Sequence, residues 1–260
     1  MSSAAQVLKP PSILASILIL TRRELRNVLR VPSGYLPALL IPLFFYAVQS
    51  AQLSGLAEAA GVDNYPAFVL PVALLFATAN DGAGLSLVFD IERGYFDKIR
   101  LTPVSRVSLL FGAMSANLVR VFVQGALVTA VAFLFGLHFE TGPLGALGML
   151  GLAVLWGMTY AGFGLGIALR TGSPQATQSA GFFMFPLMFL TTSFAAAETM
   201  EPGWFKTAIQ YNPVTYLLEG MRGFSQTGDL ADVGKALLAI IPLATLTFVF
   251  ALTGLRSRSR

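Results

Sequence analysis

Long apolar segments alternate with short polar or charged ones along the chain. A transmembrane helix needs roughly 20 mostly apolar residues, and six segments approach or exceed that length with few or no charges. They cover residues 35–53, 68–89, 115–137, 144–169, 179–197 and 236–255, and the third is continuously apolar only from Val121. These segments are apolar on every side, whereas strands of a membrane barrel alternate between apolar and polar residues. The pattern predicts an all-α integral membrane protein with six transmembrane helices in a single transmembrane domain, residues 1–260.

Composition and charge placement support this prediction and add an orientation. Hydrophobic residues make up 55% of the chain and charged residues 12%, with a mean hydropathy of +0.70, far from the values of soluble proteins. Thirteen of the 17 lysines and arginines lie before the first span, in residues 90–106, at Arg170 or after the last span. The positive-inside rule therefore predicts that both termini and residues 90–106 are cytoplasmic.

The same charge placement bears on partners and on the cellular setting. The net charge of +4 follows from the loop bias, so it gives no reason to expect nucleic-acid binding. Arginine greatly outnumbers lysine, and alanine and glycine are abundant, which is typical of a GC-rich bacterium. We therefore expect a multi-pass protein of the bacterial inner membrane.

Residues 12–31 form a separate amphipathic pattern before the first span. Leucines 18, 25 and 29 share one helical face, and the basic residues gather on another: Arg22, Arg23, Arg26 and Arg30. The apolar stretch is too short to span a membrane, and it ends in charges without a small-residue cleavage pattern, which argues against a secretory signal. We expect an amphipathic helix on the cytoplasmic surface that anchors to anionic lipid, docks a partner, or does both.

Several kinds of chemistry are excluded by the residues that the chain lacks. It has no cysteine and a single histidine, His138, so disulfides, thiolate metal sites and a Ser/His/Asp triad are not expected. It also lacks the glycine-rich phosphate-binding motif and the dinucleotide fingerprint. We therefore expect no metal or cofactor on this chain and no catalytic activity of its own.

Residues 90–106 concentrate charge between two long apolar runs. Ile91, Tyr95 and Ile99 recur every four residues and predict one apolar stripe on a helix whose other side carries mixed charges. Gly94 weakens such a helix by roughly 1 kcal/mol relative to alanine, and Thr102-Pro103 ends it. The pattern predicts a short helix along the membrane surface that a partner holds. An ordinary inter-helix loop with solvated charges is the alternative.

The segment 198–234 predicts two short helices near the opposite surface. Trp204–Tyr211 forms one, Asn212-Pro213 breaks it with Asn212 available as a cap, and Val214–Phe224 forms another. Its aromatic residues are of the types that sit at the lipid headgroups. Helices that dip into the outer leaflet explain both the aromatics and the modest charge, and Glu219 and Arg222 are spaced to pair there. A surface loop with an exposed ion pair is the alternative.

Two ionisable residues are expected near membrane depth. Asp81 lies nine residues before Asp90, about 13 Å inside at helical rise, and Arg120 precedes the third apolar run. We expect them to pair across the second and third spans. Proton transfer is the alternative, although no further intramembrane acid or histidine extends a relay.

Two separated motifs carry a family resemblance. Glu92-Arg93-Gly94 with Leu101-Thr102-Pro103-Val104-Ser105-Arg106, and Tyr211-Asn212-Pro213-Val214-Thr215 with the downstream Arg222, closely resemble the signatures of type 2 ABC exporter permeases, especially the daunorubicin-resistance-like group. The resemblance extends over essentially the whole chain. It implies a non-catalytic permease that works with a second, identical or homologous permease copy. Two separate ABC ATPase subunits, which bind ATP and Mg, would power the pair.

The resemblance also implies roles for particular residues. The coupling helix that the ATPase grips would include Glu92, Arg93, Gly94, Thr102 and Pro103, with Lys98 and Arg100 as further contacts. The outer re-entrant gate would include Asn212, Pro213, Glu219 and Arg222. The substrate path would lie between the two permease copies and be lined mainly by the second and fifth spans, which here offer Phe76, Asn80, Phe182, Phe185 and Met188.

The expected function is export of a hydrophobic or amphiphilic substrate by alternating access. A drug, a lipid and a lipid-linked glycan all fit an apolar, aromatic path. A secondary transporter and a non-transport membrane scaffold are the alternatives. The scarcity of intramembrane carboxylates disfavours the first of these, and neither alternative explains both motifs.

Overall fold

The chain is described here from a computed structural model that covers residues 12–30, 36–59, 64–79, 82–94, 106–193 and 200–257. Within these ranges all regular structure is helical. The α-helices are α1 (Ile13–Arg30), α2 (Leu36–Ala59), α3 (Tyr65–Thr78), α4 (Gly82–Glu92), α6 (Arg106–Leu134), α7 (Gly142–Thr171), α8 (Pro174–Phe189), α9 (Trp204–Tyr211), α10 (Pro213–Arg222) and α11 (Leu230–Ser257), and a π-helical turn, η3 (Gly223–Thr227), follows α10.

Four helical stretches in the described part of the chain are long and apolar enough to cross a membrane. They are Tyr65–Glu92, which joins α3 and α4, Leu110–Leu134 in α6, Gly142–Thr171 in α7 and Leu230–Arg256 in α11, while Leu36–Gln52 in α2 is apolar but shorter. The all-α integral membrane class predicted from the sequence is therefore confirmed. The number of six spans stays a prediction.

Local sequence signals account for several helix ends. Asn64 caps α3 by accepting a hydrogen bond from the backbone N–H of Ala67, and Ser173 caps α8 in the same way from Ala176. Gly172 ends α7 in the left-handed conformation, at a φ of 61°, which glycine adopts without steric cost. Short connections of this kind place consecutive helices side by side.

The structure corrects three of the predicted spans. The fifth ends at Phe189, because the chain bends over residues 190–193, where a helix to residue 197 was expected. The second consists of two helices, since α3 ends at Thr78 and α4 begins at Gly82. The third helix, α6, begins at Arg106 where a span from residue 115 was expected, so Arg120 lies well inside a 29-residue helix.

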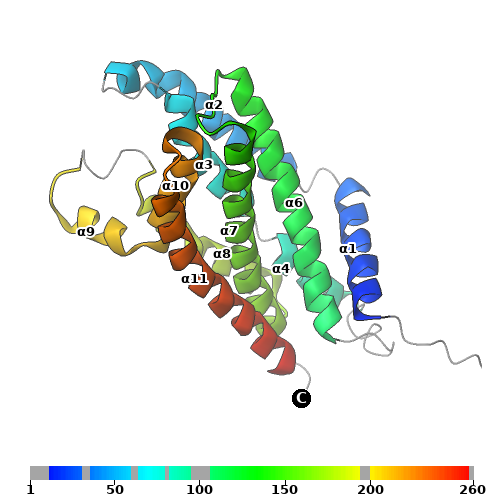
Figure 1. Cartoon of the computed structure of the whole chain (residues 1–260). Coiled ribbons are helices and arrows are strands. Elements are labelled where there is room, and N and C mark those ends of the chain that lie inside the picture. Colours follow the sequence, from blue (N-terminus) through cyan, green and yellow to red (C-terminus); the bar gives the residue numbers. More distant parts are fainter. Residues whose placement is uncertain are drawn as a thin grey trace, which may run out of the picture.

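The helix α7 is the centre of the bundle. Figure 1 shows it between α6 and α11, and it also packs against α3, α4 and α8. Glycines permit the closest of these contacts: a Cβ on Gly166 would lie 2.2 Å from the ring of Phe250, and one on Gly162 would lie 3.2 Å from the backbone of Thr247. Small residues at helix contacts let backbones approach closely in membranes.

The helix bundle has two ends, called the α10 end and the α1 end after the helices that lie there. At the α10 end, the start of α3 meets the α6–α7 connection and η3, because the side-chain amide of Asn64 donates to the carbonyl of His138 and the backbone carbonyl of Asn64 accepts from the side-chain amide of Gln226. At the α1 end, Arg170 near the end of α7 donates to the carbonyl of Phe250 and to the hydroxyl of Thr253 on α11. Each end is therefore closed by side chains that bridge different helices.

Candidate functional site

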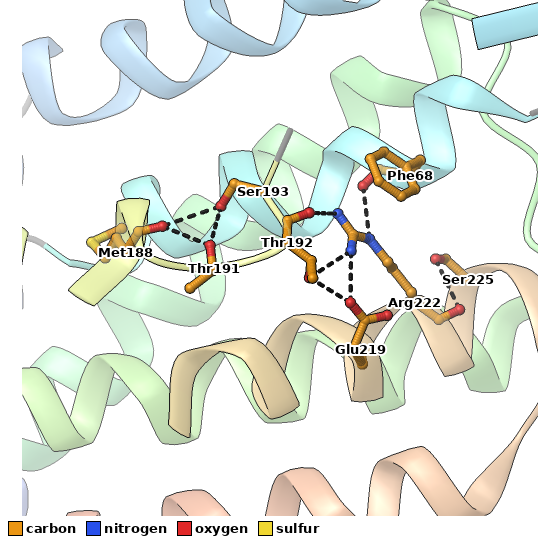
Figure 2. A network of polar contacts seen from close by, with 8 residues as sticks. All are labelled: Phe68, Met188, Thr191, Thr192, Ser193, Glu219, Arg222 and Ser225. Atoms are coloured by element: carbon orange, nitrogen blue, oxygen red, sulfur yellow. Dashed lines mark hydrogen bonds and ion pairs between the residues drawn. The ribbon is translucent and has the colours of Figure 1, made fainter. Parts of the chain in front are cut away.

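Arg222 is the centre of a buried polar network at the α10 end (Figure 2). Its side chain, on the last turn of α10, is buried, with 4% of the residue exposed. Nη1 contacts a carboxylate oxygen of Glu219 at 3.0 Å and the hydroxyl of Thr192 at 3.0 Å, and Nη2 donates to the carbonyl of Thr192 at 2.8 Å. The Thr192 hydroxyl donates in turn to Glu219. A buried charge is tolerated in this way when it is both paired and hydrogen-bonded.

The same guanidinium reaches α3. Nε donates to the carbonyl of Phe68 at 3.4 Å, and the guanidinium carbon lies 3.7 Å from the centroid of the Phe68 ring. That arrangement is a cation–π contact, which is strongest where water is excluded. Arg222 therefore joins three segments that are far apart in the sequence: α10, the start of α3 and the bend after α8.

Asn212 makes a second polar junction at the other end of α10. Its side-chain oxygen accepts a hydrogen bond from the backbone N–H of Val214 at 3.0 Å, which caps α10, and Pro213 occupies the first turn. Its side-chain nitrogen donates to the carbonyls of Leu187 and Leu190, each at 2.6 Å. These carbonyls lie where α8 ends, and the last carbonyls of a helix have no partner within it.

Aromatic side chains form a chain of contacts between α2, α3 and α8. The ring of Phe76 lies 5.2 Å from that of Phe45, 5.8 Å from that of Phe185 and 5.7 Å from that of Phe189, measured between centroids. Phe185 and Phe189 are also in contact, at 5.0 Å. Tilted and edge-on arrangements at these distances are favourable for aromatic pairs.

The predicted substrate-path residues have different positions relative to this aromatic chain. Phe76 and Phe185 are members of it, whereas Phe182 lies on the exposed surface of α8. Met188 is buried, and its carbonyl accepts hydrogen bonds from the hydroxyls of Thr191 and Ser193. Asn80 lies outside the described residues.

Arg23 and Asp90 form a two-pronged ion pair at the α1 end. Nη2 and Nη1 of Arg23 lie 2.5 and 2.7 Å from the two carboxylate oxygens of Asp90, the geometry in which guanidinium and carboxylate pair most strongly. The pair joins α1 to the last turn of α4. Nearby, α1 packs closely on α6, since a Cβ on Gly112 would lie 2.6 Å from that of Leu20. The other predicted basic residues of α1, Arg22, Arg26 and Arg30, are exposed.

The predicted coupling residues begin where α4 ends. Glu92 is its last residue, and Glu92 and Arg93 are exposed. Gly94 has a φ of 66°, a left-handed conformation that ends the helix. The left-handed Gly94 interrupts the helix after Ile91, and Tyr95 and Ile99, the other members of the expected apolar stripe, lie outside the described residues. Lys98, Arg100, Thr102 and Pro103 lie outside the described residues.

Arg120 lies in the interior of α6 and contacts a polar neighbour on the same helix. It donates to the side-chain oxygen of Asn117, whose amide donates to the carbonyl of Gly157 on α7 at 3.2 Å. This arrangement ties α6 to α7 at the level of the predicted spans. The expected partner, Asp81, lies outside the described residues, so the pair stays a prediction.

Three residues that complete these contacts were not predicted from the sequence. Thr192 and Phe68 contact Arg222, and Asp90 contacts Arg23. Only Asp90 carried a signal, as a charge at the boundary of an apolar run. A hydroxyl and a phenyl ring in apolar sequence give none. Among the residues that the structure describes, no three His, Cys, Asp or Glu side chains are grouped to hold a metal ion.

Comparison with known proteins identifies relatives over most of the chain. Residues 15–224 match the profile of the ABC-2 type transporter family. The chain is 26% identical over 227 residues to the daunorubicin resistance ABC transporter permease protein DrrB1 of Streptomyces coeruleorubidus, a match that covers 83% of this chain and 79% of the relative.

Two further relatives come from other lineages. A probable doxorubicin resistance ABC transporter permease protein DrrC of Mycobacterium tuberculosis is 23% identical over 241 residues, which cover 88% of this chain and 87% of that protein. The putative transport permease ycf38 of Pyropia yezoensis is 25% identical over 224 residues, or 81% and 74% of the two chains. Each match extends over most of both chains, so the similarity concerns most of the helix bundle.

Proposed function

This chain belongs to the ABC-2 type transporter family, as its two motifs predicted, and on that premise we propose that it is the membrane-spanning subunit of an ATP-driven exporter. The substrate is hydrophobic or amphiphilic: a drug, a lipid or a lipid-linked glycan. It leaves the cytoplasm or the inner leaflet by alternating access. The observation that carries this proposal is the family match across residues 15–224, which includes both motifs and most of the described helices.

The aromatic chain supports the choice of substrate class. Phe45, Phe76, Phe185 and Phe189 present adjacent rings on helices that correspond to the first, second and fifth predicted spans. A path lined in this way favours flat or apolar groups and offers them few hydrogen-bond partners. Both relatives named above for daunorubicin or doxorubicin resistance are permeases by name, which makes an amphiphilic aromatic drug the first substrate to test.

The α1 end is the proposed site of coupling to the ATPase. Two ATPase subunits, which hold ATP and Mg, drive a pair of permeases from the cytoplasmic side, where both termini lie. Exposed Glu92 and Arg93 follow directly on the turn of α4 that Arg23 holds through Asp90, so a force applied at Glu92 acts on a helix already fixed to α1. Charged, exposed contacts suit a partner that binds and releases in each cycle.

The test is purification of the chain from membranes of its native host, followed by identification of the proteins that accompany it. An ABC ATPase is the expected companion. In vesicles that contain this complex, ATP should drive accumulation of daunorubicin, and Glu92→Ala and Pro103→Ala should leave the amount of membrane-inserted protein unchanged while ATP hydrolysis continues without transport.

Glu201→Ala is the matched control for these variants, because Glu201 is exposed and lies in the segment before α9, far from α4 in the sequence. It should transport like the unchanged protein. Absence of any ATPase from the purified complex, or full coupled transport in both Glu92→Ala and Pro103→Ala, would contradict the proposal.

A further inference from the structure

The two ends of α10 are attached to the same short segment, residues 187–192, which covers the last turn of α8 and the bend after it. Asn212, which caps the start of α10, donates to the carbonyls of Leu187 and Leu190. Arg222, at the end of α10, donates to the carbonyl and the hydroxyl of Thr192. A helix of ten residues is about 15 Å long, so the two contacts hold α10 at two separated points.

The orientation of the Asn212 amide is fixed by its own cap. Its oxygen accepts from the N–H of Val214, and its nitrogen therefore faces the end of α8. Asn212 is 4% exposed, so water is not at hand to replace the bonds to α8 if the two helices separate. One side chain thus begins α10 and completes the C-terminal end of α8.

Arg222 extends this attachment to α3. Because its guanidinium also donates to the carbonyl of Phe68 and lies against the Phe68 ring, the start of α3 is held by the residue that holds Thr192. Separation of α3 from the end of α8 would leave a buried charge without part of its bonds, which is strongly unfavourable. The ends of α3 and α8 that lie near α10 are therefore both fixed to α10, and both of these helices contribute rings to the aromatic chain.

We propose that Asn212 and Arg222 are positioning residues that hold α10 and the α10 ends of α3 and α8 together as one body, so that these three elements move jointly during transport. This inference rests on the proposed function in one respect: it assigns the joint movement to the export cycle. Opening at this end then occurs between the two permease copies. It does not separate α3 from α8 within one copy.

The first test compares two asparagines that each cap a helix at this end. Asn212→Ser keeps a cap oxygen and removes the amide that bonds α8, while Asn64→Ser keeps the α3 cap and removes only the bond to His138. Hydrogen exchange of the purified permease should be about tenfold faster at residues 187–193 in Asn212→Ser. It should be unchanged there in Asn64→Ser. Equal exchange at 187–193 in all three proteins would overturn the proposal.

The second test measures transport in vesicles with the ATPase complex and daunorubicin as the probe. Asn212→Ser should hydrolyse ATP but move several-fold less daunorubicin for each ATP than the unchanged protein, and Asn64→Ser should match the unchanged protein. Asn212→Ser could exchange faster at residues 187–193 and still move as much daunorubicin for each ATP as the unchanged protein. In that case α10 and the ends of α3 and α8 are not used as one body in export, and the proposal would be wrong. If the unchanged complex moves no daunorubicin with ATP, the proposed function fails, and the exchange experiment alone decides whether Asn212 holds the end of α8 to α10.

Discussion

The two ends of the bundle each contain an arginine–carboxylate pair, and the two pairs differ in what surrounds them. Arg23 and Asp90 pair through both oxygens, with 29% and 16% of their side chains exposed, and join α1 to α4 although the two residues are 67 positions apart. Arg222 and Glu219 pair across one helical turn, with 5% and 37% exposed, but Arg222 also bonds α3 and the segment after α8. The Arg23–Asp90 pair is partly exposed to water, which suits a contact that forms and breaks as force is applied to it. The second belongs to a buried junction that suits a fixed point.

The largest effect is expected from removal of the buried guanidinium. Arg222→Met keeps much of the side-chain volume but leaves Glu219 and the carbonyls of Phe68 and Thr192 without these donors. Loss of one partner from a buried ion pair costs about 3–5 kcal/mol. Thermal unfolding of the purified protein in detergent should show a decrease of this size in the free energy of unfolding. A loss below about 1 kcal/mol would contradict the fixed-point interpretation.

A smaller loss is expected when the Thr192 hydroxyl alone is removed. Thr192→Val keeps the shape of the side chain and removes the group that lies between Arg222 and Glu219. An unsatisfied buried partner costs about 1–3 kcal/mol. Thr192→Ser keeps the hydroxyl and should recover most of the stability in the same unfolding measurement. A larger loss in Thr192→Ser than in Thr192→Val would mean that packing of the methyl group matters and the hydroxyl does not.

The pair at the α1 end should contribute about 1 kcal/mol, because it is partly exposed. Arg23→Gln and Asp90→Asn should each lower stability by about that amount. The reversed pair, Arg23→Asp with Asp90→Arg, should recover part of it. Non-additivity between these two single variants and the double variant Arg23→Gln/Asp90→Asn measures the interaction itself. Additive losses with no recovery would show that the contact does not link α1 to α4 energetically.

The smallest effects on stability are expected from salt concentration and from substitution of Arg22, the exposed neighbour of Arg23. Both further distinguish the α1 end from the α10 end. Raising the salt concentration from 0.1 to 1 M shortens the Debye length from about 10 to about 3 Å. The difference in stability between the unchanged protein and Arg23→Gln should therefore shrink, while the difference from Arg222→Met should not. Arg22→Gln, which alters an exposed arginine of α1, should change stability by less than about 0.5 kcal/mol. A larger change would mean that the exposed face of α1 has a partner in the purified protein.

Features that depend on nearby residues were predicted well from the sequence. The fourth span was expected at 144–169, and the helix α7 covers Gly142–Thr171. The two agree because the long apolar run and the glycine that follows it define where this helix begins and ends. The short helix Trp204–Tyr211 and the cap at Asn212 follow from local turn and capping preferences. The family resemblance, which also depends on short motifs, is confirmed by the match across residues 15–224.

Features that depend on distant residues were not predictable. The end of α8 is completed by Asn212, more than 20 residues later, so the apolar pattern through residue 197 gave no reason to stop at Phe189. Phe68 and Arg222 are 154 residues apart, and nothing in either local sequence indicates their contact. The motif around Asn212 could be recognised from the sequence, but the segment that it holds became visible only in the folded chain.

The order Asn212-Pro213 has a consequence for the chemical ageing of the protein. Spontaneous deamidation of asparagine proceeds through attack of the next backbone nitrogen on the side-chain carbonyl, and proline, which has no N–H, does not complete this reaction. Conversion of Asn212 to aspartate would replace the donor to Leu187 and Leu190 with a negative charge against two carbonyl oxygens. Pro213, the first residue of α10, thus also protects its neighbour Asn212 from this reaction and preserves the donor to α8.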